Sequence, residues 1–175
     1  MEMVCGLITL SACALALLGV VLWAATVTVS YGDALFVYTI KSNQRWYLSV
    51  QSNSAVSLGN KTTATAFFVA SAASQGGAIL SNEPLMLGFV DNLGSTSYVG
   101  SDVEQQVVVK PDQTLLCVPS WPIMYDQVLA VNIYLSDLTL EPATSENNNY
   151  NKTLVFAQEK QPNVQWYFQD YALYG

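Results

Sequence analysis

The stretch "RWYLSVQSNSAVSLG" (45–59) decides the fold class. Apolar and polar side chains alternate, the chain turns at Ser52–Ser54, and the alternation resumes. A period of two is typical of a half-buried strand, so the stretch predicts a short β-hairpin. It lies between "ALFVYTI" (34–40) and "AFFVA" (66–70), which are rich in aromatic and β-branched residues and predict two further strands.

The same rhythm returns twice along the chain. A middle set comprises "ILS" (79–81), "LMLGFV" (85–90), "SYVG" (97–100) and "QQVVVK" (105–110). A last set comprises "LAVNIYLS" (129–136), "LTLEP" (138–142), "LVFAQ" (154–158) and "QWYFQ" (165–169). Short strands at regular spacing, with no amphipathic helix between them, predict an all-β sandwich or barrel.

The order of the first set, a leading strand, then "YLSV", "VSLG" and "AFFV", resembles a lobe of the β-trefoil superfamily. In that fold, three such four-stranded units close a six-stranded barrel capped by hairpins. The resemblance implies that Tyr47, Leu48, Val56, Leu58 and Phe67 fill the barrel. A small jelly roll or an Ig-like sandwich is the alternative, because the same strand spacing permits it.

The segment from Met3 to Gly32 contains no charged side chain. About 20 apolar residues suffice to cross a bilayer as a helix, so we expect an uncleaved transmembrane anchor over residues 1–32 and a β domain over 33–175. A cleaved signal peptide is the alternative, although the long run and the lack of a basic N-terminal region disfavour it. Trp23 and Tyr31 are placed where aromatic residues of a membrane interface tend to lie.

The composition excludes several classes of function. With 6 Lys and Arg residues against 13 Asp and Glu residues, the chain has no basic surface for nucleic acid. It has no histidine, the commonest general base and metal ligand. The acidic residues are scattered and are interpreted as turn-forming and solubilising. We therefore expect no catalytic, cofactor or metal site, no small-molecule substrate, and a free thiol at Cys117, on a strand of the domain.

Two kinds of binding residue remain to be considered. Ricin-type sugar-binding trefoils carry a Gln-x-Trp motif near the end of each lobe, but here the pattern occurs at Gln44–Trp46, by the second strand of the first set. Aromatic residues in segments that interrupt the repeat are candidate partner contacts, unless they pack back over the core. These residues are Trp121, Tyr125 and Tyr150.

These features favour a non-enzymatic structural or interaction protein, a β domain on a membrane anchor that binds other proteins of an assembly. By architecture it resembles the minor capsid proteins that link the inner membrane of large icosahedral DNA viruses to their outer shell. The alternative is a membrane-tethered, lectin-like module. Lys41 and Arg45 follow the apolar segment, so the positive-inside rule predicts a cytoplasmic domain, with Asn60 and Asn151 of the two glycosylation sequons unmodified.

Overall fold

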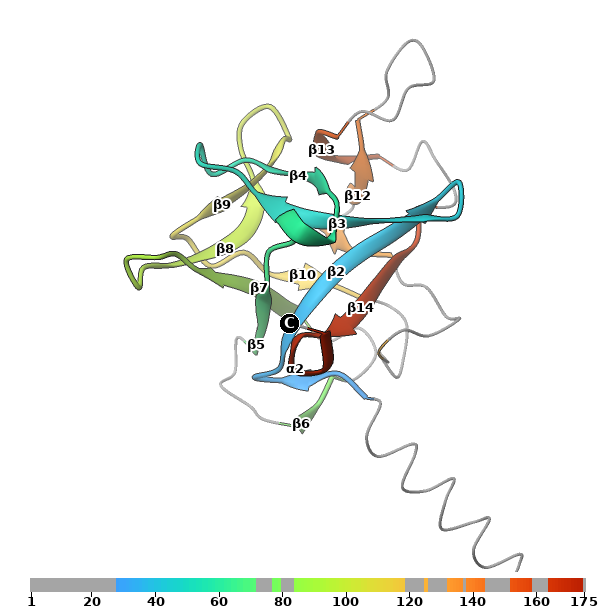
Figure 1. The fold of residues 1–175 in the computed structure, drawn as a ribbon. Helices are drawn as coiled ribbons and strands as arrows, with labels where there is room; N and C mark the ends of the chain where they lie inside the picture. The colour runs from blue at the N-terminus through green and yellow to red at the C-terminus, as the bar shows by residue number, and fades with distance from the viewer. Residues whose placement is uncertain are drawn as a thin grey trace, which may run out of the picture.

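The computed structural model shows an all-β domain, which confirms the predicted fold class (Figure 1). The residues that it describes are 28–71, 77–79, 84–118, 125, 132–136, 138–143, 152–158 and 164–174. The helical parts of these residues are the 3-10 turn η1 (Lys61–Thr63) and the four-residue helix α2 (Tyr171–Tyr174).

The strands fall into three consecutive sets. The first set is β2 (Ala34–Lys41), β3 (Gln44–Val50), β4 (Val56–Gly59) and β5 (Phe67–Ser71). The second set is β7 (Pro84–Val90), β8 (Thr96–Ser101), β9 (Val107–Lys110) and β10 (Leu116–Cys117). The third set is β11 (Tyr134–Leu135), β12 (Leu138–Pro142), β13 (Leu154–Ala157) and β14 (Trp166–Asp170).

The outer strands of each set form one continuous antiparallel wall. In this wall β14 pairs with β2, β2 with β5, β5 with β7, β7 with β10, and β10 with β11. The inner strands of each set pair with each other as hairpins, β3 with β4, β8 with β9 and β12 with β13. The hairpin pairing is therefore the same in all three sets, and the outer strands also pair with each other in the first two sets, β2 with β5 and β7 with β10.

The three hairpins meet one another in a cyclic arrangement. Each hairpin donates one backbone N–H hydrogen bond to a neighbouring hairpin and accepts one from the other neighbour. The accepting carbonyl lies four residues before the donating N–H in the sequence. The three bonds, each 2.8 Å long, run from Leu58 N to Lys152 O, from Val109 N to Ser54 O and from Phe156 N to Gln105 O. The constant spacing of four residues between acceptor and donor gives this end of the molecule pseudo-threefold symmetry.

The main core follows the same repeat. Each hairpin contributes a pair of directly opposed, buried apolar residues. These pairs are Leu48 with Leu58, Val99 with Val109, and Leu140 with Phe156. Trp166 of β14 is also fully buried, and its indole Nε1 donates a hydrogen bond to Leu140 O at 3.0 Å. Burial of an indole requires such a partner for its N–H.

The expected core residues Leu48, Val56, Leu58 and Phe67 lie in this main core. The expectation for Tyr47 is wrong: the residue is buried, but in a second cluster with Phe36 and Tyr38. Successive side chains of a strand point to opposite faces. Since Leu48 points into the main core, its neighbour Tyr47 points to the outer face.

The middle set is shifted by one strand relative to the prediction. The strand that pairs with β5 is β7, not "ILS", and the set ends with β10 at Leu116–Cys117. A two-residue strand is too short to show an alternating pattern, which explains why β10 was not assigned to the middle set. Cys117 lies on this strand as predicted, as a partly buried free thiol.

The folded domain begins earlier than residue 33. Strand β1 (Ser30–Tyr31) pairs with β6 (Gly77–Ala78), and Val29 is 0% exposed. Residues 28–32, which the sequence analysis assigned to the anchor, therefore belong to the β domain. The rest of the expected anchor, with Trp23, lies outside the described residues. In the part of the chain that the structure describes, no helix is long and apolar enough to cross a membrane.

Candidate interaction surfaces

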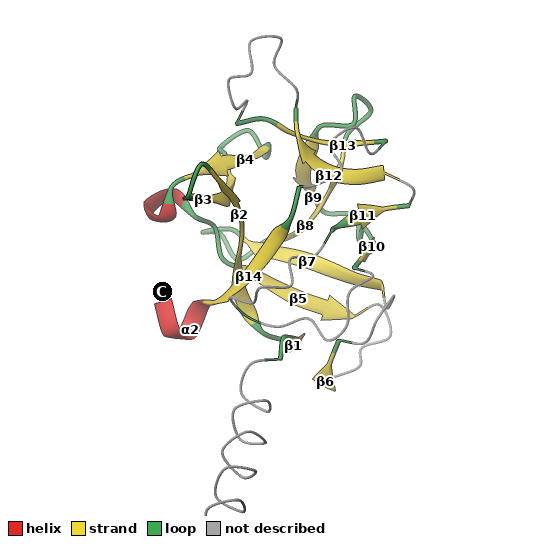
Figure 2. Cartoon of the chain, turned by 90° about the vertical axis from the view of Figure 1, so that its right-hand side faces the viewer, coloured by secondary structure: helices red, strands yellow, loops and turns green. Residues whose placement is uncertain are grey.

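The domain has two ends, which we name by their elements. The proximal end carries β1, β6 and α2, and the described chain begins there at residue 28 (Figure 2). The distal end carries β4, β9 and β13 and is formed by the three converging hairpins (Figure 2). Candidate binding residues lie at both ends and on the side between them.

Tyr125 is fastened to the proximal end. Its hydroxyl donates a hydrogen bond of 2.7 Å to Asp33 Oδ2, which also accepts one of 2.8 Å from Ser30 N. Burial raises the pKa of Tyr125, and the hydrogen bond to Asp33 and the negative charges of Asp33 and Asp170 raise it further. The neutral phenol is therefore the form that the fold stabilises.

A pocket of about 440 Å³ opens beside this bond, lined by residues that include Asp33, Tyr125, Asp170 and Tyr171. The Tyr125 hydroxyl is hydrogen-bonded within the domain. The expected contact of Tyr125 with a partner protein is therefore left to its aromatic ring. Tyr31, the expected interface residue, packs against the main core and donates a hydrogen bond of 3.4 Å to Pro84 O. Trp121 and Tyr150 lie outside the described residues.

Two acidic residues, Asp91 and Asp102, form turns as the sequence analysis predicts, whereas Glu141 of β12 is 2% exposed and does not solubilise the surface. Asp91 Oδ1 accepts hydrogen bonds from the backbone N–H groups of Leu93 and Ser95. Asp102 Oδ1 does the same for Glu104 and Gln106. Both carboxylates thus fix hairpin turns, and within the described ranges no three metal-ligating side chains come together.

Between the two ends, β2, β3 and β14 carry an outer aromatic cluster, formed by Phe36, Tyr38 and Tyr47. Tyr38 contacts Tyr47 at 5.4 Å between ring centroids and stacks on Tyr167 at 5.2 Å. Phe36 meets the edge of Tyr47 at 6.2 Å, and the Tyr47 hydroxyl donates to Gln169 Oε1 at 3.1 Å. Because the Tyr47 hydroxyl has this hydrogen-bond partner, burying it on this face costs little free energy.

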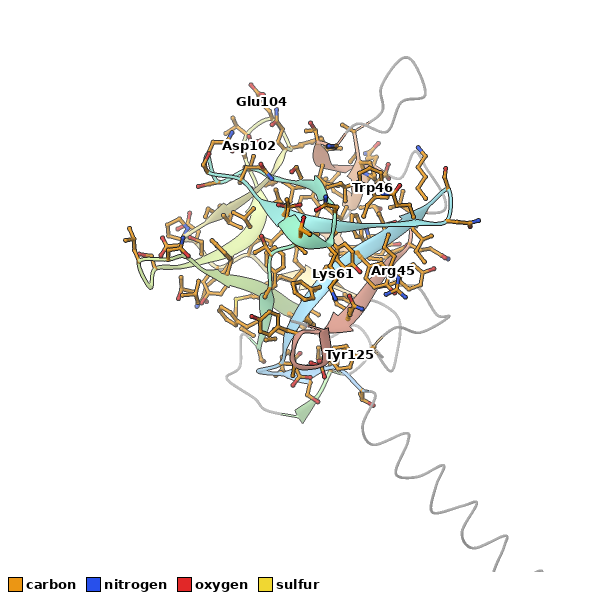
Figure 3. The ribbon with its side chains drawn as sticks, viewed as in Figure 1. Arg45, Trp46, Lys61, Asp102, Glu104 and Tyr125 are labelled. Carbon is orange, nitrogen blue, oxygen red and sulfur yellow. The ribbon has the colours of Figure 1, made fainter. Side chains whose placement is uncertain are left out.

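Two cations cover the outer aromatic cluster. The guanidinium carbon of Arg45 lies 4.7 Å from the centroid of Tyr38, and the Lys61 ammonium nitrogen lies 5.9 Å from that of Phe36. Figure 3 shows both residues on the same face of the molecule. Cation–π contacts of this kind hold long side chains over aromatic rings.

Sequence reasoning missed this cluster, although a signal for it was present. In "ALFVYTI" both the odd and the even positions are apolar, with Leu35 and Val37 on one face and Phe36 and Tyr38 on the other. A strand that is apolar on both faces indicates that both are covered.

The distal end is hollowed where the hairpins meet. A groove of about 580 Å³ is lined by all three hairpins and has no charged residue in its wall. Its polar groups include Gln51, Ser57, Gln106 and Thr153. Gln51 Nε2 donates hydrogen bonds to Ser57 Oγ at 2.8 Å and to Ser49 Oγ at 3.2 Å, so this amide is held in place.

The Gln44–Trp46 pattern does not form a sugar platform. Arg45 covers Tyr38, and Trp46 is partly buried against the main core. An aromatic ring that binds sugar must expose one face for stacking. Packing against the core covers part of the Trp46 ring.

Comparison with known proteins finds structural likeness but no match by sequence. No family model matches the chain, and no curated protein matches its sequence. Among solved structures, the SDF2-like protein from Arabidopsis thaliana superimposes with a TM-score of 0.50 at 15% identity, over 81% of this chain and 94% of that protein. At this identity the likeness concerns the fold alone.

Proposed function

We propose that this chain is a non-enzymatic interaction protein, in which a β-trefoil domain is held on a membrane by its N-terminal segment and works in a large assembly. The observation that carries the proposal is the arrangement of the two ends. The described chain begins at the proximal end, at residue 28, and the converging hairpins lie at the opposite end (Figure 2). A membrane-held domain of this form presents the hairpins away from the lipid.

The β-trefoil assignment rests on the repeat. Three sets of four strands, three hairpins joined by equivalent backbone bonds and three equivalent core pairs support it over a sandwich. In a sandwich, two sheets face each other and no cyclic contact among three hairpins is required.

The assembly that fits best is a particle with an internal membrane. A weakly charged domain, 11% charged residues over the chain, suits a protein packed against neighbours. In such a particle the chain would link the inner membrane to an outer protein shell, as minor capsid proteins of large DNA viruses do. The domain then lies on the cytoplasmic side, with Asn60 and Asn151 without glycan.

Membrane attachment is tested by flotation of the full chain with phospholipid vesicles. We expect the unchanged chain to float with the lipid and the variant Leu17→Arg with Val21→Arg to remain at the bottom, because charges at the centre of an apolar span oppose insertion. A far-ultraviolet spectrum that is unchanged in the variant shows that its domain is folded. Flotation of both proteins, or of neither, would contradict the proposal.

The role in an assembly is tested on the natural source. Fractionation should place the chain in a large particle or membrane complex, and intact mass should show no glycan at Asn60 or Asn151. Recovery as a freely diffusing secreted domain would overturn the assembly role. Glycan on either asparagine would reverse the membrane orientation.

A lectin-like module is the second candidate, and the distal groove favours it. Neutral amides and hydroxyls such as those of Gln51, Ser57 and Gln106 are groups that bind sugar hydroxyls. A glycan array probed with the full chain in detergent, beside a Gln51→Ala and Gln106→Ala variant, separates the two functions. Specific binding that the variant loses would establish the lectin function.

A further inference from the structure

Two basic side chains lie over one face of the domain. The whole chain has 6 Lys and Arg residues, and two of them, Arg45 and Lys61, lie exposed on β3 and η1. Arg45 and Lys61 flank the outer aromatic cluster. Ile40 and Tyr171 of the neighbouring elements are 46% and 43% exposed. We name this area, Arg45 and Lys61 with the aromatic cluster beneath them, the basic aromatic surface.

A feature of opposite charge stands elsewhere on the same molecule. The turn between β8 and β9 carries Asp102, Val103 and Glu104, and Val103 is 100% exposed. The two hydrogen bonds to Asp102 Oδ1, together with Gln105 in the left-handed region at φ 64°, hold this acidic tip in one conformation. Figure 3 shows Asp102 and Glu104 at the distal end, apart from Arg45 and Lys61.

We propose that the acidic tip of one copy docks on the basic aromatic surface of a second copy. Each combines exposed apolar side chains with two like charges. Val103 lies between two carboxylates, and Ile40 and Tyr171 lie beside the cations Arg45 and Lys61. Arg and Tyr are enriched among residues that dominate binding energy, and a preformed turn loses little conformational entropy on binding. The occupant is a second copy because complementary patches occur on one chain.

The contact joins two different patches, so it is heterologous. Contacts of this type propagate as open chains unless their rotation closes a ring. Successive copies would therefore associate laterally into rows. This inference goes beyond the proposed function and does not depend on membrane attachment.

Sedimentation of the full chain in detergent, over a wide range of protein concentration, tests the proposal. We expect concentration-dependent association that weakens with salt, because exposed charges are screened. Val103→Ser should weaken it at least about tenfold, as loss of a central contact does. The matched control is Leu93→Ser, at another hairpin turn and 90% exposed, which should leave association unchanged.

Charge reversal identifies the two surfaces. Glu104→Lys and Lys61→Glu should each weaken association at least about tenfold, and the chain with both changes should recover most of it. Lys152→Glu, at an exposed lysine of another hairpin, serves as the control. Far-ultraviolet spectra of all variants confirm that they are folded.

Three results would overturn the proposal. The unchanged chain remains monomeric at every concentration, or Leu93→Ser weakens association as much as Val103→Ser, or the double charge reversal restores nothing. A monomeric chain whose Lys61→Glu variant no longer accompanies its natural assembly would instead assign the basic aromatic surface to an acidic partner protein. Flotation with vesicles is unaffected by these variants, so failure here is distinguishable from failure of the proposed membrane function.

Discussion

At the scale of single residues, close packing and buried polar contacts account for the least replaceable positions. Gly88 of β7 lies directly opposite Phe68 of β5, and a Cβ at residue 88 would collide with the Phe68 ring. The Phe68 ring thus occupies the space that any other residue at position 88 would need. Asp33 and Tyr125 are a second such pair, joined by a hydrogen bond across 92 positions of sequence.

Gly88→Ala is expected to lower the free energy of unfolding by about 1–3 kcal/mol, the range typical of overpacking. Urea unfolding followed by fluorescence measures the loss. Phe68→Leu in the same chain should recover part of it, because the smaller side chain vacates the space of the new methyl group. Additive losses in the double variant would show that the two residues do not share that space.

Alkaline pH should reveal the Tyr125 contact. The folded chain raises the pKa of Tyr125 above its ordinary value of 10.0, so the unfolded chain loses this proton first as the pH rises. The contribution to stability is complete below pH 10 and is lost above it. Urea unfolding at several pH values should show a steeper decline above about pH 10 for the unchanged chain than for Tyr125→Phe. Parallel declines would contradict the raised pKa.

At the scale of elements, the hairpins contribute to the core from one face only. Leu48 of β3 points into the main core, whereas its neighbour Tyr47 points into the outer aromatic cluster. The two faces of β3 therefore serve different clusters, and only the inner one belongs to the threefold set of core pairs. The turns are fixed separately, by side chains such as Asp91 and Asp102.

Leu48→Ala and Phe67→Ala are each expected to cost about 2–5 kcal/mol, since both side chains are buried in the main core. Ile40→Ala is the control, because Ile40 lies in the adjacent strand β2 and is 46% exposed. It should cost less than about 1 kcal/mol. Chemical denaturation gives all three values, and losses below about 0.5 kcal/mol at both core residues would contradict the register of the first strand set.

At the scale of the whole molecule, the domain includes the residues just before position 33. Val29 is fully buried and β1 pairs with β6, so the chain that follows the N-terminal segment is part of the packed structure. The Asp33 carboxylate joins these residues to Tyr125 and thus to the neighbourhood of β14. Residues 28–33 are consequently part of the folded proximal end.

A fragment of residues 28–175 should therefore be more stable than one of 33–175. The difference expected from Val29 alone is about 1.5–3 kcal/mol, the value of burying a medium-sized apolar side chain. Both fragments should give a β-type far-ultraviolet spectrum with little helix. Thermal unfolding compares the two, and equal stability would show that residues 28–32 contribute nothing to the domain.

The amino-acid sequence by itself determined the all-β class, the positions of most strands and the use of Asp91 and Asp102 in turns. These features depend on local patterns, namely alternation along a strand and turn residues between strands, which a short window of sequence contains. Only the tertiary structure decided the outer aromatic cluster, the Asp33–Tyr125 bond, the inclusion of residues 28–32 in the domain and the cyclic contact of the hairpins. Each of these depends on which distant strands pair and which face of a strand a neighbour covers, and no local pattern encodes that choice.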